Sequence, residues 1–237
     1  MNSKSLPTDC HTCKSRRDSV FCDLSDEHLK ILNEAKTSNE YKPNQIIFYE
    51  GNKPFGLYCI TSGKVKIYKM DSEGHQQIVR LAGAGDLIGY RSLLAEEPYS
   101  ATAETLENAN VCFVDKNVFL DVLQTHPATA MNVMSSLARD LGKAEHQIVN
   151  LTHKNIRERL AELFLIFKKR YGEKTAKGIH LNINLTREEL GELIGTTQES
   201  VIRLLSEFKQ DGLIEVDGRQ ITLLNIGKLT QTANLLE

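Results

Sequence analysis

The sequence predicts an α+β fold in three successive parts: an antiparallel β-roll, one long helix and a C-terminal winged helix-turn-helix. Three observations indicate this fold. Turn residues recur evenly in the first half, apolar residues follow alternating steps of four and three in the middle, and two capped helices precede a hairpin signal. We therefore expect a cysteine-bearing segment over residues 1–29, the β-roll over 30–125, the long helix over 126–153 and the winged helix-turn-helix over 154–237.

The composition is that of a globular protein, with 41% hydrophobic and 25% charged residues among 237. The sequence has no apolar stretch long enough to span a membrane and no secretory signal, so we expect a cytoplasmic protein without membrane association. Its five cysteines are an odd set, which in a reducing compartment favours metal or redox chemistry over disulfides. We find no catalytic triad, phosphate loop or carboxylate pair and do not expect an enzyme. The net charge of −2 means that any surface for nucleic acid must be local.

Short strands are expected from about residue 41 to residue 123. Glycines in turn-like contexts recur every eleven or twelve residues, at Gly51, Gly63, Gly74 and Gly85. This spacing is typical of a sandwich or barrel of short strands. In "KVKIYK" the alternation points Val65 and Ile67 inward and Lys64, Lys66 and Lys69 to solvent. We therefore predict an antiparallel β-roll or jelly roll.

The middle part is one helix with a narrow apolar strip. The strip has the spacing of a coiled-coil seam and comprises Ala130, Met134, Leu137, Leu141, Ala144, Ile148 and Leu151. Polar side chains cover most of the remaining surface, which suits pairing with a second copy better than burial in a core. We expect a homodimer, and because the seam carries no charge, we expect it to persist without a cofactor. The alternative is a core helix packed on its own sheet.

The third part predicts two short helices joined by a tight turn. Thr186 with Glu189, and Thr196 with Glu199, read as two capping boxes, and Gly195 lies at the turn between the helices. The shared core is assigned to Leu190, Ile194, Val201, Leu204 and Phe208. Gly191 is small where the helices must approach closely. A helix-turn-helix is expected, and the alternative is a helical hairpin that merely packs.

A hairpin signal follows this helix pair. Two β-like runs flank Asp217 and Gly218, which makes the unit a winged helix-turn-helix. The start of its second helix is expected to enter the major groove of DNA, where the candidate contact residues are Thr197, Gln198, Glu199, Ile202 and Arg203. Arginine can bind guanine O6 and N7, and glutamate can accept from cytosine N4. A surface ion pair between Glu199 and Arg203 is the alternative, and both roles are compatible.

The order of these parts and three sequence blocks resemble the CRP/FNR family of bacterial transcription regulators. The blocks are "GDLIGY", "KNIRERLAELF" and "ESVIRLLSEFKQDGLI". The resemblance implies a cyclic-nucleotide-binding-like roll and a palindromic double-stranded DNA site with a GA step in each half-site. Arg203 would read the guanine of that step and Glu199 the cytosine paired with it. It also implies that the turn in "KMDSEGHQQ" contacts RNA polymerase; the alternative is a solvated hairpin turn.

The charged anchors of cyclic-nucleotide-binding members are missing at the matching positions. Those members carry Gly-Glu and, about ten residues later, Arg-Ser or Arg-Thr, where this chain has Gly89-Tyr90 and Ser100-Ala101. Arg91 lies nearby but stands where the family has an apolar residue. A cyclic phosphate without a matched cation is poorly held, so a cyclic nucleotide is not the expected effector.

The cysteines resemble those of the oxygen-sensing, FNR-like branch of the family. That resemblance implies a [4Fe-4S] cluster on Cys10, Cys13, Cys22 and Cys112, and hence sensing of oxygen, redox state or nitric oxide. The eight residues between Cys13 and Cys22 make a longer gap than in sensing members, and Cys59 reads as a small core residue. Alternatives are zinc, with Cys112 or His11 completing the site, a thiol–disulfide switch, or no ligand. In the last case the roll would respond to a small organic effector or a cyclic nucleotide.

Overall fold

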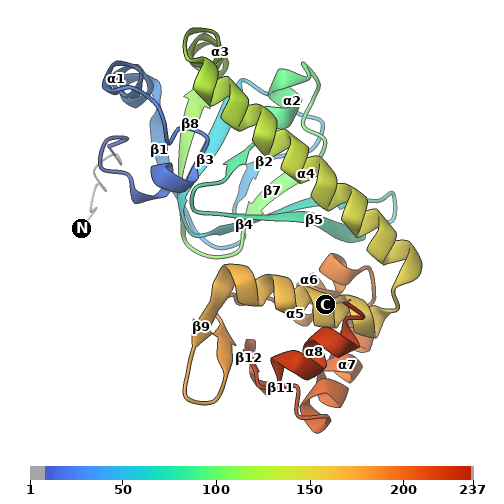
Figure 1. Cartoon of the computed structure of the whole chain (residues 1–237). Helices are drawn as coiled ribbons and strands as arrows, with labels where there is room; N and C mark the ends of the chain where they lie inside the picture. The colour runs from blue at the N-terminus through green and yellow to red at the C-terminus, as the bar shows by residue number, and fades with distance from the viewer. Residues whose placement is uncertain (1–8, 236–237) are drawn as a thin grey trace, which may run out of the picture. The chain divides into compact units, whose positions relative to one another are not determined.

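The protein, described here as a computed structural model, divides into two compact units (Figure 1). The structure describes residues 9–235. The first unit runs to Leu141 and the second begins at Gly142. Among the described residues, none of the helices has the length and apolar character needed to cross a membrane.

The first unit is a roll of two antiparallel sheets with helices at its edges. One sheet has the strand order β1-β8-β3-β6 and the other β2-β7-β4-β5, which confirms the predicted β-roll. Its elements are a 3-10 helix (Lys14–Asp18), α1 (Asp26–Ala35), β1 (Thr37–Tyr41), β2 (Ile46–Phe48), β3 (Gly56–Ser62), β4 (Lys64–Met70), β5 (Gln76–Gly83), β6 (Leu87–Ile88), α2 (Tyr90–Leu94), β7 (Thr102–Thr105), β8 (Ala109–Asp115) and α3 (Lys116–Thr125).

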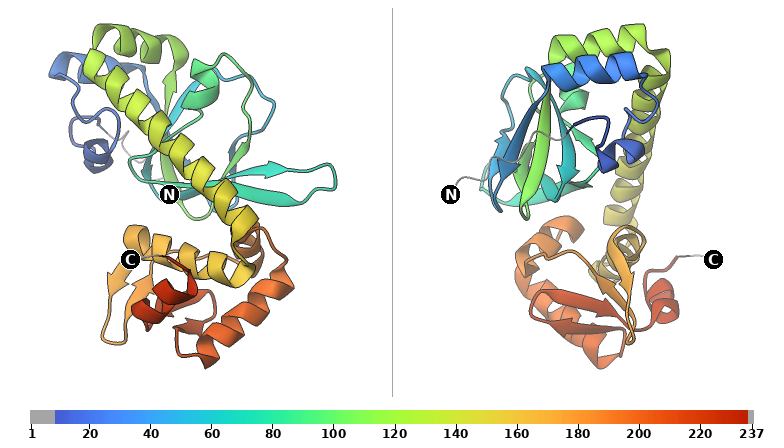
Figure 2. Two further views of the ribbon diagram at one scale, coloured as in Figure 1. Left: turned by 45° about the vertical axis from the view of Figure 1, so that its right-hand side comes forward. Right: turned by 90° about the vertical axis from the view of Figure 1, so that its left-hand side faces the viewer.

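Turn geometry explains why glycine recurs between these strands. Gly63, between β3 and β4, has a φ of 85°, and a Cβ there would lie 2.5 Å from the carbonyl oxygen of Asn108. A larger residue would meet both a strained backbone and a clash. Figure 2 shows α1 and α3 side by side at one end of the roll. Phe21 and Leu24, which precede α1, are buried in the core beneath these helices, so the N-terminal segment is part of this unit's packing.

The predicted alternation in β4 is wrong for two lysines. Lys66 is only 7% exposed; its ammonium lies 3.8 Å from a carboxylate oxygen of Glu104 and 5.4 Å from the centre of the Tyr68 ring. Lys64 is half-buried and pairs with Glu107 at 2.8 Å. A bulge between Ile67 and Tyr68 shifts the register against β5. The carboxylates of Glu104 on β7 and of Glu107 in the β7–β8 turn offset the burial of the two ammonium groups.

Helix α4 (Pro127–His153) begins against the roll and continues into the second unit. Thr129 and Val133 are buried, and Leu137 packs against the same core. The other large seam residues are exposed: Met134 by 53%, Leu141 by 62%, Ile148 by 63% and Leu151 by 40%. The start of α4 therefore does pack on its own roll, with Leu137 included, while an apolar stripe stays uncovered along its length.

The second unit is a helix-turn-helix with a four-stranded sheet of order β11-β12-β10-β9. Its elements are α5 (Ile156–Tyr171), β9 (Gly172–Lys174), β10 (Ile179–Leu181), α6 (Arg187–Ile194), α7 (Gln198–Gln210), β11 (Ile214–Asp217), β12 (Gln220–Leu223) and α8 (Ile226–Thr232). The predicted core residues of the helix pair are all buried: Leu190, Ile194, Val201, Leu204 and Phe208. The predicted winged helix-turn-helix is confirmed, and the β9–β10 hairpin extends its sheet.

Local capping explains where α6 and α7 begin. The capping box of Thr186 and Glu189 is confirmed, with reciprocal hydrogen bonds of 3.0 and 2.8 Å. The second predicted capping box is wrong: α7 is capped by Thr197, whose hydroxyl accepts from the Ser200 amide at 3.3 Å. Thr196 still belongs to the turn, because its amide donates to the carbonyl of Gly191 at 3.0 Å.

Candidate functional sites: a recognition helix and a thiol cavity

Helix α7 has one buried and one exposed face, as a groove-reading helix requires. Val201, Leu204, Leu205 and Phe208 are buried against the rest of the unit. The predicted contact residues all lie at its exposed start: Thr197, Gln198, Glu199, Ile202 and Arg203. The arrangement can therefore present a carboxylate, an amide and a guanidinium to the edges of bases.

Glu199 lies in the first turn of α7, where its carboxylate meets the helix N-terminus. Hydrogen bonds from its own backbone amide and from the Thr197 hydroxyl lower the pKa of this carboxyl. The group is ionised at neutral pH and can act as an acceptor for cytosine N4.

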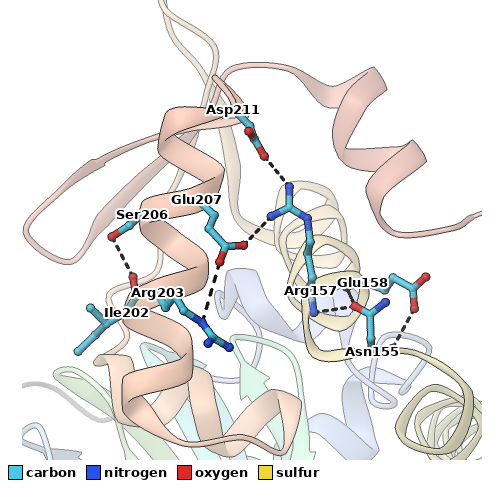
Figure 3. Close-up of polar contacts among 8 residues, drawn as sticks. All are labelled: Asn155, Arg157, Glu158, Ile202, Arg203, Ser206, Glu207 and Asp211. Carbon is cyan, nitrogen blue, oxygen red and sulfur yellow. Dashed lines mark hydrogen bonds and ion pairs between the residues drawn. The ribbon is translucent and has the colours of Figure 1, made fainter.

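The ionic partner of Arg203 is Glu207, one turn further along α7, at 3.9 Å (Figure 3). The structure therefore pairs Arg203 with Glu207, four residues after it, and not with Glu199, four residues before it. Glu207 also accepts from Arg157 of α5 at 2.9 Å, and Arg157 reaches Asp211 at 2.6 Å. This chain of charges ties the guanidinium that would read a base to the neighbouring helix.

Two further cations near the wing were missed from the sequence. Arg187, at the start of α6, donates to the carbonyl oxygen of Gly218 in the wing turn at 2.6 Å. Burial, and next the charge of Arg219, lower the pKa of Arg187. Arg219 is exposed in the same turn. Arginines in this place suit contacts with DNA phosphates, and an arginine directly after the predicted Asp217-Gly218 turn was the available signal.

The other candidate site lies on the sheet β1-β8-β3-β6. In register, Cys112 of β8 stands opposite Ser38 of β1 on one side and Cys59 of β3 on the other. Directly opposed residues of antiparallel strands project from the same face. Cys59 and Cys112 border a cavity of about 40 Å³, whose lining also includes Cys10 and Cys13 from the N-terminal segment.

The environment of these thiols is low in polarity. Burial raises the pKa of the Cys10 thiol, while the nearby Lys36 ammonium opposes the shift. Burial raises the pKa of Cys59 well above its usual value, and the neighbouring Cys112, Cys10 and Cys13 thiols add to the rise. The four sulfurs are thus electrostatic neighbours, and the raised pKa values of Cys10 and Cys59 favour the neutral form of these two thiols.

Cys22, the third predicted ligand, lies in a different environment. Its thiol accepts from the Asn132 side chain at 3.7 Å, and among the described residues it does not border the cavity. Burial, followed by the neighbouring Asp23 carboxyl, raises the pKa of Cys22. The structure therefore brings Cys10, Cys13 and Cys112 together and leaves Cys22 apart. In its place it adds Cys59, which the sequence had suggested to be a core residue.

The thiols that line the cavity are donors suited to a thiophilic metal, although the structure does not hold them at metal-binding distances. Within residues 9–235, no three His, Cys, Asp or Glu side chains are close enough to hold a metal ion. Arg16 lines the cavity, and its Nε is buried without a hydrogen-bond partner among the described residues. A thiolate or sulfide in the cavity would supply the acceptor that this N–H lacks. The donor types therefore fit a metal–thiolate centre.

The position that matches the carboxylate anchor of cyclic-nucleotide-binding proteins is occupied here by Tyr90, a packed side chain. Tyr90 is 2% exposed, and its hydroxyl lies 3.3 Å from Ser136 Oγ and 3.2 Å from Asp140 Oδ2, both in α4. Inside the roll, Phe48 stacks on Tyr99 with ring centres 4.0 Å apart. Tyr90 therefore joins the roll to α4, where a nucleotide-binding member would offer a carboxylate to a ribose.

Both units of the chain match known proteins. A family model for cyclic nucleotide-binding domains matches residues 38–126, and one for Crp-like helix-turn-helix domains matches residues 158–232. The chain is 28% identical over 225 residues to electron transport regulator A of Shewanella oneidensis, covering 94% of this chain and 90% of that protein. Identity to the fumarate and nitrate reduction regulatory protein of Escherichia coli is 27% over 225 residues, with the same coverage. The solved structure of FixK2 from Bradyrhizobium japonicum aligns with a TM-score of 0.77 at 25% identity, over 85% of this chain and 99% of that one.

Proposed function

Because the chain belongs to the CRP/FNR family of DNA-binding transcription regulators, as its motifs predicted, we propose that it binds a palindromic DNA site as a homodimer. The family comprises regulators and not enzymes. In this proposal Arg203 reads the guanine of a GA step in each half-site and Glu199 its paired cytosine. The observation that carries it is the exposure of both side chains at the capped start of α7.

The exposed stripe of α4 supports the dimer. Large apolar side chains stay uncovered along the helix, at Met134, Leu141, Ile148 and Leu151, and Met131 and Val149 widen the stripe. Such a continuous apolar strip on a surface helix is typical of a subunit interface. A two-fold axis through this seam would set the two copies of α7 against the two half-sites of a palindrome.

The signal proposed is oxygen, redox state or nitric oxide, acting through an iron–sulfur cluster on the cavity thiols. Relatives named as electron transport and as fumarate and nitrate reduction regulators support this choice. When bound, the cluster would supply reactivity toward oxidants. The chain would contribute the thiolates, and the cations Lys36 and Arg16 beside them would offset their charge.

A contact with RNA polymerase is proposed for the β4–β5 turn. Asp71 organises this turn by accepting from the amides of Glu73 and His75, each at 2.9 Å. The turn is exposed and preformed, as a contact with a partner requires.

DNA recognition is tested by replacing Arg203 and, as a control, a second exposed cation of α7. Arg203→Ala is expected to weaken binding to a matched palindromic duplex by ~5- to 150-fold, because a lost arginine–guanine pair is worth ~1–3 kcal/mol. Binding to a duplex with the GA step exchanged should change little. Lys209→Ala, which removes an exposed cation later on the same helix, is the matched control. Fluorescence anisotropy at fixed salt measures the affinity of each variant for the matched and the exchanged duplex. Equal discrimination between the two duplexes by Arg203→Ala and wild type would contradict the proposal.

The cofactor is tested on protein purified without oxygen. We expect thiolate-to-iron absorption that disappears in air, with iron and acid-labile sulfide present in equal numbers per chain. Zinc is counted in the same samples. Protein that binds neither metal, even after reconstitution, would refute this part of the proposal and leave the DNA-binding part standing.

A further inference from the structure

Cys59 occupies a fixed place on the face that carries Cys112. The two cysteines are paired in register on β3 and β8, the central strands of their sheet. Cys59 is also paired with Leu87 of β6 on its other side. The sheet therefore holds both thiols on one face, next to each other, without help from the N-terminal segment.

The N-terminal segment brings two more thiols over this pair. The Cys10 amide donates to the Asn33 side chain at 3.0 Å, which ties the segment to α1. The Cys13 thiol lies 3.0 Å from the Ser15 hydroxyl. Cys10, Cys13, Cys59 and Cys112 then line one cavity, two of them from the N-terminal segment and two from adjacent strands.

Cys22 does not line this cavity and makes other contacts. Asn132 of α4 donates to the Cys22 thiol at 3.7 Å and also to the carbonyl of Val20 and the carboxylate of Asp23, each at 3.2 Å. Arg16 donates to the Cys22 carbonyl at 2.9 Å. Phe21, the preceding residue, is buried in the core. Bringing the Cys22 thiol into the cavity would break these contacts and unpack Phe21.

We propose that the metal centre of this protein is ligated by Cys10, Cys13, Cys59 and Cys112, and that Cys22 lies outside the ligand set. This inference deepens the proposed function and rests on it for the presence of a centre. Each thiol releases its proton to solvent on ligation. Closing the set requires the loop carrying Cys10 and Cys13 to move toward the strands, while Phe21 and Cys22 keep their present contacts.

The test compares two matched serine variants of the full-length protein. Cys59→Ser is expected to lower the iron and sulfide content per chain by ~10-fold or more, whereas Cys22→Ser should load like wild type. Metal content, Mössbauer spectra and anaerobic absorption are recorded, and circular dichroism shows whether each variant is folded. If the protein binds zinc in place of iron with the same dependence on the two cysteines, the ligand set is supported and the iron–sulfur part of the proposed function is rejected.

Wild-type protein provides a second measurement that does not depend on a variant. Loaded and metal-free samples are alkylated with iodoacetamide, and each cysteine is followed by mass spectrometry. We expect the Cys22 alkylation rate to be the same in both samples. Protection of Cys22 on loading, or loss of metal from Cys22→Ser with retention by Cys59→Ser, would overturn the inference while leaving the metal centre in place. A wild-type protein that holds no metal would instead reject the centre itself.

Discussion

Arg157 connects the two helices that carry and support base recognition. Its guanidinium joins Glu207 at 2.9 Å and Asp211 at 2.6 Å (Figure 3). It also lies 4.8 Å from the centre of the Phe208 ring. Because Glu207 also faces Arg203, the position of the base-reading side chain depends on a residue of α5. The exposure of Arg203 was predictable from helical periodicity, but this ionic partner was not, because it depends on how α5 packs against α7.

Arg157→Ala is therefore expected to lower the free energy of unfolding by ~1–2 kcal/mol, the sum of a partly exposed ion-pair network and a cation–π contact. Urea unfolding followed by circular dichroism measures the change. Arg157→Lys, which keeps one charge but cannot bridge two carboxylates, should lose less. Lys169→Ala, at an exposed site on the same helix, is the control. A loss in Arg157→Ala no larger than in the control would contradict this role.

At the scale of elements, the regular patterns were predictable and the contacts between elements were not. The Thr186 capping box, the turn at Gly195 and the wing hairpin follow from local chemistry, and the structure has them where they were expected. The cap of α7 was displaced by one residue because the turn continues through Thr196. The burial of Lys66 depends on a bulge and on a strand far away in the sequence, which a simple alternation does not anticipate.

Two helical glycines, Gly191 of α6 and Gly142 of α4, are expected to respond oppositely to alanine substitution. A Cβ at Gly191 would lie 2.6 Å from the Thr196 carbonyl oxygen, so Gly191→Ala should lower stability by ~1–3 kcal/mol and weaken DNA binding. Gly142 lies inside α4 with nothing within 4 Å of a Cβ, so Gly142→Ala should raise stability by ~0.5–1 kcal/mol. Thermal and urea unfolding compare the two, and equal effects of both changes would disprove the packing argument.

For the whole molecule, the order of roll, long helix and winged helix-turn-helix was predictable because each part has its own period of apolar residues. The thiol site was predictable only in part. Sequence spacing grouped Cys22 with Cys10 and Cys13, but Phe21 is buried in the core and Cys22 stays with it. Cys59 looked like a core residue because its partner across the strands, Cys112, is 53 positions away in the sequence.

The uncharged seam of α4 leads to the last prediction, which concerns assembly. Metal-free protein is expected to sediment as a dimer, since Leu141 and Ile148 are exposed by 62% and 63% and carry no charge to oppose pairing. A glutamate at either position would be buried without a partner, which costs ~3–5 kcal/mol, so Leu141→Glu or Ile148→Glu should raise the dimer dissociation constant by ~100-fold or more. Arg139→Glu, an exposed charge change outside the seam, should leave it unchanged. Analytical ultracentrifugation decides: a wild-type chain that is monomeric without metal would mean that the cofactor controls assembly, whereas a persistent dimer means that any signal reaches DNA through movement within the dimer.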